Sequence, residues 1–231
     1  LFNMHQTVLL KEAVDGLALK EGETVVDCTV GAGGHAEEIC QRMGDKVKII
    51  ALDLDQDALD RSEKRLSPMG CNISFHLSNF RDFDAVLEKL NISLVNGFIL
   101  DLGFSSYQLE DSGRGFSFKK DESLKMTLKR DVTETDVTAE MIVNEWAEES
   151  IANIIYGYGN EGFSRKIARE IVLAREKAPI KTTTELVAII EGAVPFFYKR
   201  GKIHPATKTF QALRIAVNDE LGALQEFLEK G

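Results

Sequence analysis

The sequence predicts a doubly wound α/β fold built on a parallel sheet, and two patterns lead to this prediction. Over the first 110 residues, short apolar runs alternate with segments of helical periodicity. Each apolar run ends in glycine or polar residues, as parallel strands do where their carboxyl ends form a binding edge. The first run, 24–30, leads into Gly31, Gly33 and Gly34, a turn where the missing Cβ lets a ligand approach the backbone.

Sequence periodicity assigns the elements in order. An amphipathic helix is expected over 5–19, with Thr7 as its N-cap. Strands are expected at 24–30, 46–52, 72–77 and 95–100, with helices between them at 36–43, 57–66 and 82–90. After about Asp111 the alternation stops, and 112–130 reads as a loop rich in glycine, serine and charge. Further helices are expected at 138–148, 149–156, 164–177, 184–192 and 210–228.

This change of pattern predicts two domains. Residues 1–111 and 205–231 would form the sheet domain, with a four-stranded parallel core, and 112–204 would form an inserted, mostly helical domain. No apolar run approaches the ~20 residues that cross a bilayer, so no membrane span is expected. The first residues lack the basic and long apolar regions of a signal peptide, and a cytoplasmic protein is the default expectation.

The three cysteines, Cys28, Cys40 and Cys71, are odd in number and widely spaced. This spacing argues against both a disulfide framework and a zinc site. Cys28 is expected to be a small buried thiol. No other metal-ligand cluster is visible, and His204 precedes a proline, which suits a structural hydrogen bond better than metal binding.

The charge is unevenly distributed around a net value of −9. Residues 1–110 carry 10 basic and 18 acidic side chains, whereas residues 160–208 carry 10 basic and 5 acidic ones. A basic segment in an acidic chain is compatible with binding to phosphate groups. A solvated helical surface explains the same charges, so both interpretations stay open.

The glycine turn and the acidic residues around it favour one class of nucleotide-like ligand. The pattern Gly31-x-Gly33-x-x-Ala36 formally satisfies the dinucleotide fingerprint, and Asp53, 22 residues after Gly31, suits ribose hydroxyls. However, Asp27 lies inside the first strand, and the fourth strand ends in the segment DLGF at 101–104. Both features favour a methyltransferase that uses S-adenosylmethionine over an enzyme that uses NAD.

Six segments match one family in order and spacing. They are HQTVLL at 5–10, DCTVGAGGH at 27–35, DLGFSSYQL at 101–109, RGFSF at 114–118, YGNE at 158–161 and HPATKTFQALRI at 204–215. From about His5 to its end, the chain resembles the bacterial 16S ribosomal RNA cytosine-N4 methyltransferases, the RsmH (formerly MraW) family. The resemblance implies a Rossmann-like methyltransferase fold with an inserted helical domain that recognises the substrate.

The resemblance also implies a site for S-adenosyl-L-methionine, formed by residues that match the cofactor contacts of the family. These residues are Gly33, Gly34, His35, Asp53, Phe80, Asp101 and Gln108. The glycine turn and His35 would hold the methionine part, Asp53 the ribose hydroxyls, and Phe80 would pack beside the adenine. Structural alternatives are a plain tight turn for the glycines, a helix cap for His35, core packing for Phe80, and strand-end caps for Asp53 and Asp101.

The substrate implied by the resemblance is a cytidine in the decoding region of 16S ribosomal RNA, within the small ribosomal subunit. The exocyclic N4 amine is a poor nucleophile because its lone pair is delocalised into the ring, so an acceptor aimed at it would help. Asp101 is the candidate catalytic residue, with a main-chain oxygen of 102–105 as the alternative. The base would have to leave its stack, helped by a surface that includes Arg114, Phe116, Lys208 and Arg214. For Arg214 an ion pair on a helix surface is an equal alternative.

The chain departs from the family pattern in two places. At 121–128 it reads DESLKMTL where the family normally has DGPLDMRM, so Lys125 and Thr127 replace an aspartate and an arginine. It also ends at Gly231, before the strands with which family members continue, so either a fragment or a shortened relative is expected. These departures keep a second hypothesis open: a catalytically impaired relative that binds RNA or the ribosome.

Overall fold

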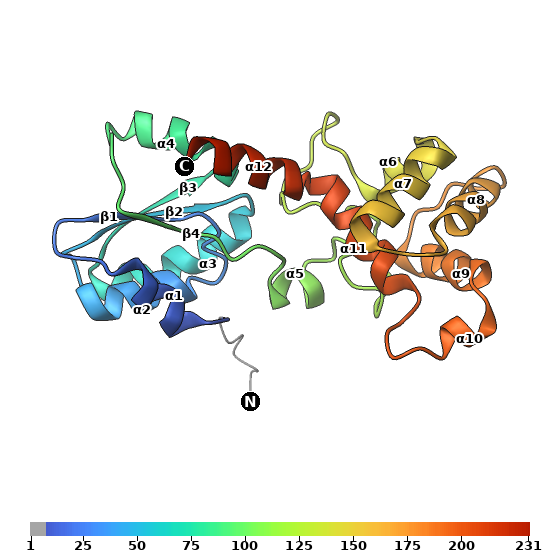
Figure 1. The fold of residues 1–231 in the computed structure, drawn as a ribbon, viewed down its shortest axis with the longest axis horizontal. Helices are drawn as coiled ribbons and strands as arrows, with labels where there is room; N and C mark the ends of the chain where they lie inside the picture. The colour runs from blue at the N-terminus through green and yellow to red at the C-terminus, as the bar shows by residue number, and fades with distance from the viewer. Residues whose placement is uncertain (1–7) are drawn as a thin grey trace. The chain divides into compact units, whose positions relative to one another are not determined.

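The computed structural model of the protein describes residues 8–231, which divide into two compact units (Figure 1). Unit 1 consists of the residues up to Ser105 together with Gly222–Gly231, and unit 2 consists of Ser106–Leu221. The predicted N-cap, Thr7, lies outside the described residues. None of the helices in 8–231 is long and apolar enough to cross a membrane.

Unit 1 is built on a parallel sheet of four strands within the described residues. The strands are β1 (Thr24–Asp27), β2 (Lys48–Asp53), β3 (Asn72–Leu77) and β4 (Gly97–Ile99), in the order β3-β2-β1-β4. The predicted doubly wound parallel fold is confirmed. β1 ends three residues earlier than expected, yet the following segment stays attached, because Cys28 N donates to Ile99 O and Val30 N donates to Leu52 O.

Helices cover both faces of this sheet because adjacent residues of a strand point to opposite sides (Figure 1). Val25 packs on the face covered by α1 (Leu10–Leu17), α2 (Gly34–Met43) and α3 (Gln56–Leu66). Val26 packs on the opposite face, which is covered by α4 (Phe83–Lys89) and the end of α12 (Glu220–Lys230). Both valines are fully buried. Two short 3₁₀ helices, η1 (Ser67–Met69) and η2 (Phe80–Asp82), complete the helical elements of this part of the chain.

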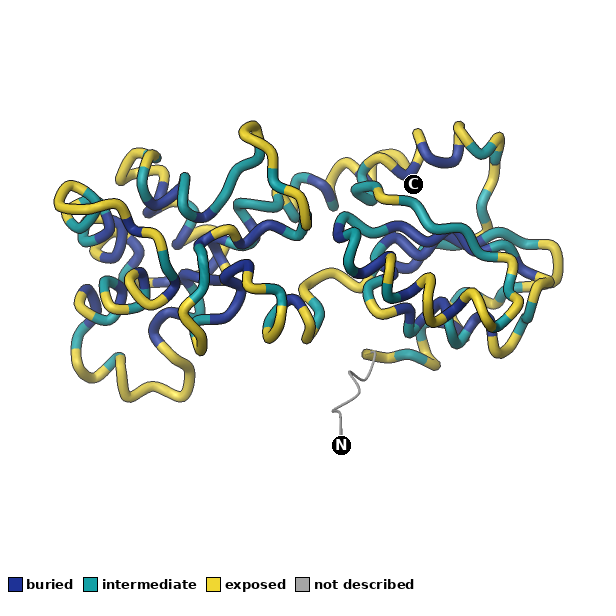
Figure 2. The backbone as a smooth tube through the Cα atoms, turned by 180° about the vertical axis from the view of Figure 1, so that it is seen from behind, coloured by how far each residue is buried: buried dark blue, intermediate teal, exposed yellow. Residues whose placement is uncertain are grey.

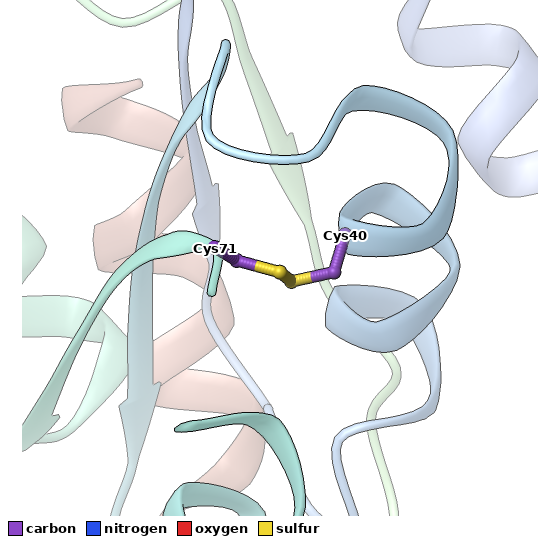
Figure 3. Close-up of a disulfide and its surroundings, with 2 residues drawn as sticks. All are labelled: Cys40 and Cys71. Atoms are coloured by element: carbon purple, nitrogen blue, oxygen red, sulfur yellow. A yellow bond between two sulfur atoms is a disulfide. The ribbon is translucent and has the colours of Figure 1, made fainter. Parts of the chain in front are cut away.

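A disulfide joins Cys40 in α2 to Cys71, which directly precedes β3 (Figure 3). The two Cα atoms are 5.6 Å apart although 31 residues separate the cysteines in sequence. The expectation that the cysteine spacing disfavours a disulfide is therefore wrong. It failed because the winding of the chain around the sheet, which spacing does not encode, brings the second half of α2 beside the start of β3. Cys28 is free and buried, as predicted, and burial raises the pKa of its thiol.

Unit 2 is a helical unit with a core of its own (Figure 2). Its helices are α5 (Ser106–Glu110), α6 (Ala139–Glu145), α7 (Glu148–Gly159), α8 (Ser164–Arg175), α9 (Thr183–Ala193), α10 (Phe196–Lys199) and α11 (Ala206–Asn218). Helix α7 packs on α8 and α11, and α8 packs on α9. The segment expected to be a loop, 112–130, is irregular, but Leu124 and Met126 are fully buried in the core of unit 2.

The boundaries of unit 2 differ from those of the predicted insertion. Unit 2 continues to Leu221 because α11 packs on α6 and α7. The single helix expected over 210–228 is wrong, since α11 ends at Asn218 and Asp219 adopts a left-handed conformation (φ 46°). The side chain of Asn218 accepts a hydrogen bond from Leu128 N (2.8 Å) and donates one to Met126 O (2.8 Å). These contacts fasten the helix end to a distant loop, which helical periodicity in the sequence does not reveal.

The close crossing of α7 and α11 gives a test of this packing. A Cβ added to Gly159 would lie 2.5 Å from Lys208 O and 3.3 Å from Ala212 Cβ. We therefore expect Gly159→Ala to lower the free energy of unfolding by about 1–3 kcal/mol, because the helices must move apart. The matched control is Gly157→Ala in the same helix, where a Cβ meets nothing within 4 Å. The control should raise stability by about 0.5–1 kcal/mol. Equal urea denaturation midpoints for the two variants would contradict the close packing.

Candidate functional site

The glycine turn lies between the end of β1 and the start of α2. Gly31 and Gly33 have positive φ angles of 53° and 82°, and Gly33 N donates to Val30 O (2.7 Å). A Cβ on Gly33 would lie 3.2 Å from Leu66 Cδ1, and Ser62 Oγ donates to Gly31 O (2.8 Å), so the turn packs tightly on α3. The backbone conformation and packing of the turn are enough to explain why positions 31 and 33 are glycines. The contact of Gly33 and Gly34 with a cofactor stays a prediction.

Helix α2 begins directly at this turn. Its N-cap is Gly33, which provides no side-chain cap, and the first main-chain N–H groups of any helix have no partner inside it. His35 is buried in the first turn of α2, and its Nε2 atom has no hydrogen-bond partner among the described residues. The helix-cap alternative for His35 is therefore not what the structure shows. A buried ring nitrogen without a partner costs free energy, which a ligand or water can recover.

Three aspartates lie at the carboxyl ends of adjacent strands. Asp27 ends β1, Asp53 ends β2, and Asp101 follows β4 by two residues. Asp27 is 1% exposed; its Oδ1 accepts a hydrogen bond from Thr29 N (3.3 Å), while its Oδ2 has no partner among the described residues. Burial, reinforced by the charges of Asp53 and Asp101, raises the pKa of Asp27 to about 7. The cluster thus holds a carboxyl whose pKa lies near neutral pH, well above the usual range of an aspartate.

The sequence pattern used Asp27 as an indicator of a methyltransferase but did not include it among the expected cofactor contacts. A carboxylate inside an otherwise apolar strand is costly to bury unless something pairs with it. Asp27 directly precedes the glycine turn and stands between two strands whose own ends carry carboxylates. We add it to the candidate site for this reason.

Asp53 connects the end of β2 to the glycine turn. Its Oδ2 accepts a hydrogen bond from Gly31 N (2.9 Å), and its Oδ1 accepts one from Asp55 N (2.9 Å). Burial raises the pKa of Asp53 to about 6, against the opposing effect of these main-chain donors. The strand-end cap considered for Asp53 is therefore present in the structure. Each carboxylate oxygen can accept a second hydrogen bond, so contact with ribose hydroxyls stays a prediction.

Asp101 and Phe80 complete the predicted site in unit 1. Asp101 is exposed, and its main-chain N donates to Thr29 Oγ1 (2.7 Å), which holds the segment after β4 against the segment after β1. Phe80 is half-buried and packs edge-on against Phe227, with the ring centroids 6.0 Å apart. Core packing, the alternative considered for Phe80, is what the structure shows, and its contact with adenine stays a prediction.

The remaining site residues lie in unit 2, and three of them, Gln108, Arg114 and Phe116, are buried. Arg114 is 5% exposed, and its Nη1 donates to Leu128 O (2.6 Å). Phe116 is also buried, with the Arg114 guanidinium 5.7 Å from its ring. Both side chains therefore lie inside the long loop rather than on an exposed surface, and their contact with RNA stays a prediction. Gln108 is buried in α5, and its cofactor contact stays a prediction.

Lys208 and Arg214 both lie on α11 and have partners within unit 2. Lys208 Nζ donates to Asn160 O (2.9 Å) at the end of α7, and its contact with RNA stays a prediction. Arg214 forms a bidentate pair with Glu220 (2.8 and 3.0 Å) whose two side chains are largely buried. The structure thus shows the ion pair considered for Arg214, although the pair is largely buried rather than on the helix surface. The structural hydrogen bond expected of His204 is confirmed, since its Nδ1 accepts from Ala206 N (3.2 Å).

The sequence profile of the MraW methylase family matches residues 3–231. The chain belongs to the MraW methylase family. This MraW chain is 44% identical to "Ribosomal RNA small subunit methyltransferase H" of Symbiobacterium thermophilum, an alignment that covers 97% of this chain and 70% of that relative. It is 45% identical to proteins of the same name from Clostridium botulinum (97% and 71% covered) and Brevibacillus brevis (96% and 70% covered).

A solved structure titled as a putative rRNA-methylase from Clostridium thermocellum overlaps 35% of this MraW chain and 45% of its own, at 21% identity. Its TM-score of 0.31 is too low to support an argument. Membership of the family, together with the parallel sheet, confirms the Rossmann-like methyltransferase fold that the resemblance implied.

MraW methylases take their methyl group from S-adenosylmethionine, and the residues of unit 1 fit that cofactor. The Oδ2 atom of Asp27 and the Nε2 atom of His35 are buried without a partner on either side of the glycine turn. Three carboxyl groups nearby suit a ligand that carries both a sulfonium and an ammonium cation. Within 8–231, by contrast, no group of three or more His, Cys, Asp or Glu side chains is placed to hold a metal ion.

The raised pKa of Asp27 predicts how stability depends on pH. Because its pKa is about 7 in the folded chain and 3.8 ordinarily, the folded state binds this proton more tightly than the unfolded state. The stabilisation is complete below about pH 4 and is lost as the pH rises through 7, at about 1.4 kcal/mol per pKa unit, or about 4 kcal/mol as an upper limit.

We expect Asp27→Asn to flatten this loss when urea unfolding is measured between pH 5 and pH 8. Asn cannot titrate, whereas Asp53, with its pKa raised to about 6, keeps contributing a smaller loss in the same direction. The control is Asp45→Asn, which removes an exposed carboxylate from the turn before β2 and should leave the pH profile unchanged. A profile for Asp27→Asn that matches that of the unchanged protein would contradict the buried, proton-binding state of Asp27.

Proposed function

We propose that this chain methylates the exocyclic N4 amine of a cytidine in the decoding region of 16S ribosomal RNA, with S-adenosylmethionine as the methyl donor. The observation that carries the proposal is the 44–45% identity, over 96–97% of the chain, to proteins named ribosomal RNA small subunit methyltransferase H. The substrate would be the RNA within the small ribosomal subunit, and the protein would act in the cytoplasm, where that subunit is found.

The glycine turn and the aspartates would bind the cofactor. When bound, S-adenosylmethionine supplies an electrophilic methyl group attached to a positively charged sulfur. Transfer of such a group is an in-line displacement, so the main task of the protein is alignment. The main-chain N–H groups at the start of α2 and the carboxylate of Asp53 would orient the two ends of the cofactor. Asp27, whose pKa is about 7, would stabilise the positive charge of the cofactor when its carboxyl is deprotonated.

Asp101 would orient the amine that receives the methyl group. Its backbone is held by Thr29 beside the end of β1, while the residue itself is exposed and accessible to a base. A carboxylate that accepts a hydrogen bond from N4 localises the lone pair of the nitrogen and stabilises the positive charge that develops there. A main-chain oxygen of 102–105 could share this role.

The alternative of an impaired, RNA-binding relative depended on Lys125, Thr127 and the end of the sequence at Gly231. Lys125 is exposed, whereas Thr127 is buried in unit 2, and its Oγ1 accepts a hydrogen bond from Lys129 N (3.2 Å). A buried, hydrogen-bonded threonine serves the local structure of the loop. The position therefore gives no support to impairment, and the identity to named methyltransferases favours the active enzyme.

Methylation of small ribosomal subunits tests this function. With subunits from a strain that lacks its own enzyme, the protein should transfer labelled methyl groups, and nucleoside mass spectrometry should identify N4-methylcytidine. Asp101→Ala should lower kcat by about 100-fold or more, which is the usual contribution of a positioned acceptor. Asp45→Asn should retain full activity, and both variants should unfold at the temperature of the unchanged protein. Normal turnover by Asp101→Ala would remove Asp101 from the mechanism, and methylation at another atom would overturn the proposed function.

A further inference from the structure

Most residues of the segment 195–204, which we call the α10 loop, are exposed (Figure 2). Phe196 and Phe197 are 69% and 71% exposed, and Ile203 is also exposed. Lys199, Arg200 and Lys202 follow the two aromatic residues, and the segment contains no acidic side chain. Adjacent exposed phenylalanines are costly on a surface that faces only water, and such patches commonly mark binding sites.

The start of the α10 loop is anchored in the core of unit 2 by Tyr198. The Tyr198 hydroxyl donates to Oε2 of Glu161, a fully buried carboxylate whose Oε1 accepts from Phe163 N (2.9 Å). The rings of Tyr198 and Phe163 also pack edge-on, 5.0 Å apart. Because Tyr198 is directed inward, Phe196 and Phe197 are held on the exposed side of the short helix α10.

The end of the α10 loop is anchored by His204. Its ring stacks on Phe118, with the centroids 4.7 Å apart, and its Nε2 lies 3.3 Å from Oε1 of Glu191. Glu191 is the acidic group at this end of the loop, and it is paired with His204 rather than with Lys199, Arg200 or Lys202. The loop therefore presents its aromatic rings and cations from a fixed base.

We propose that the α10 loop is a docking surface for an unpaired segment of RNA. The Arg200 guanidinium lies over the Phe196 ring, 4.8 Å from its centroid, which places side by side the two kinds of surface on which unpaired bases stack. Lys199 and Lys202 supply positive charge for the phosphates of the same strand. An acidic protein would be attracted by the cations but has no need of exposed aromatic faces, so RNA fits the whole patch better.

Charge complementarity also points to this segment. The chain as a whole is acidic, and residues 1–110, with 18 acidic and 10 basic side chains, repel RNA. Residues 160–208, which contain the α10 loop, have the opposite balance, with 10 basic and 5 acidic side chains. The inference rests on the proposed function, because it assigns a contact for the RNA that the enzyme would methylate.

Two variants separate the stacking from the charge. The double variant Phe196→Ala/Phe197→Ala removes the rings, and the triple variant Lys199→Gln/Arg200→Gln/Lys202→Gln removes the cations. The probe is a fluorescein-labelled oligocytidine of about 12 nucleotides, a length within the usual range for single-strand sites. Binding is followed by fluorescence anisotropy at several salt concentrations. We expect each variant to weaken binding at least tenfold, and the triple variant also to reduce the dependence on salt.

Three controls define the result. Phe196→Tyr/Phe197→Tyr keeps the aromatic faces and should restore binding, and Tyr156→Ala removes an equally exposed aromatic ring of unit 2 and should change nothing. Calorimetric titration with S-adenosylmethionine should give the same affinity for all variants. With small subunits as substrate, the loop variants should raise KM and leave kcat at saturation unchanged.

The outcomes distinguish this inference from the proposed function. Methylation with an unchanged KM in both loop variants would overturn the docking surface and leave the function standing. RNA binding that depends on the loop in a protein that transfers no methyl group would overturn the function and leave the surface standing. If the loop variants bind RNA normally but change self-association in sedimentation, the patch is a protein interface and the inference is wrong.

Discussion

The site in unit 1 depends on hydrogen bonds that tie three strand ends together. Gly31 N donates to the Asp53 carboxylate, Asp101 N donates to Thr29 Oγ1, and Thr29 N donates to Asp27. These bonds hold the glycine turn, the end of β2 and the segment after β4 at the same edge of the sheet. All three donors are main-chain N–H groups, so the backbone of this edge is ordered before a ligand arrives. The carboxylates can accept further hydrogen bonds, because each of their oxygens has two lone pairs.

Much of unit 1 could be predicted because its determinants are local in the sequence. β3 has the predicted bounds, and the other strands lie within or beside the predicted ranges, since buried parallel strands appear as short apolar runs. The misses depend on contacts between distant residues. The Cys40–Cys71 disulfide, the break at Asp219 and the end of unit 2 at Leu221 all follow from packing that periodicity and spacing do not report.

The same distinction between local sequence signals and contacts of distant residues applies to the candidate site. Asp53 and the glycines could be found from their spacing, but the burial of Arg114 and the pairing of Arg214 with Glu220 could not. Charged and aromatic side chains in a family motif suggest a surface, whereas in unit 2 they hold a loop and a helix end in place. The exposure of Phe196 and Phe197 could not be predicted for the opposite reason. Consecutive phenylalanines suggest core until the structure shows Tyr198 turned inward and both neighbours exposed.

The disulfide has a topological consequence for the cofactor edge. Cys40 and Cys71 close a covalent ring that contains β2, α3 and Asp53, while the glycine turn lies just outside it. The ring holds the turn through Asp53 at Gly31 N, Ser62 at Gly31 O and Arg65 at Ala32 O. If β1 and β2 separate, the disulfide therefore still limits the distance between α2 and α3, because both helices contribute residues to the covalent ring. The glycine turn therefore stays attached to this covalent ring.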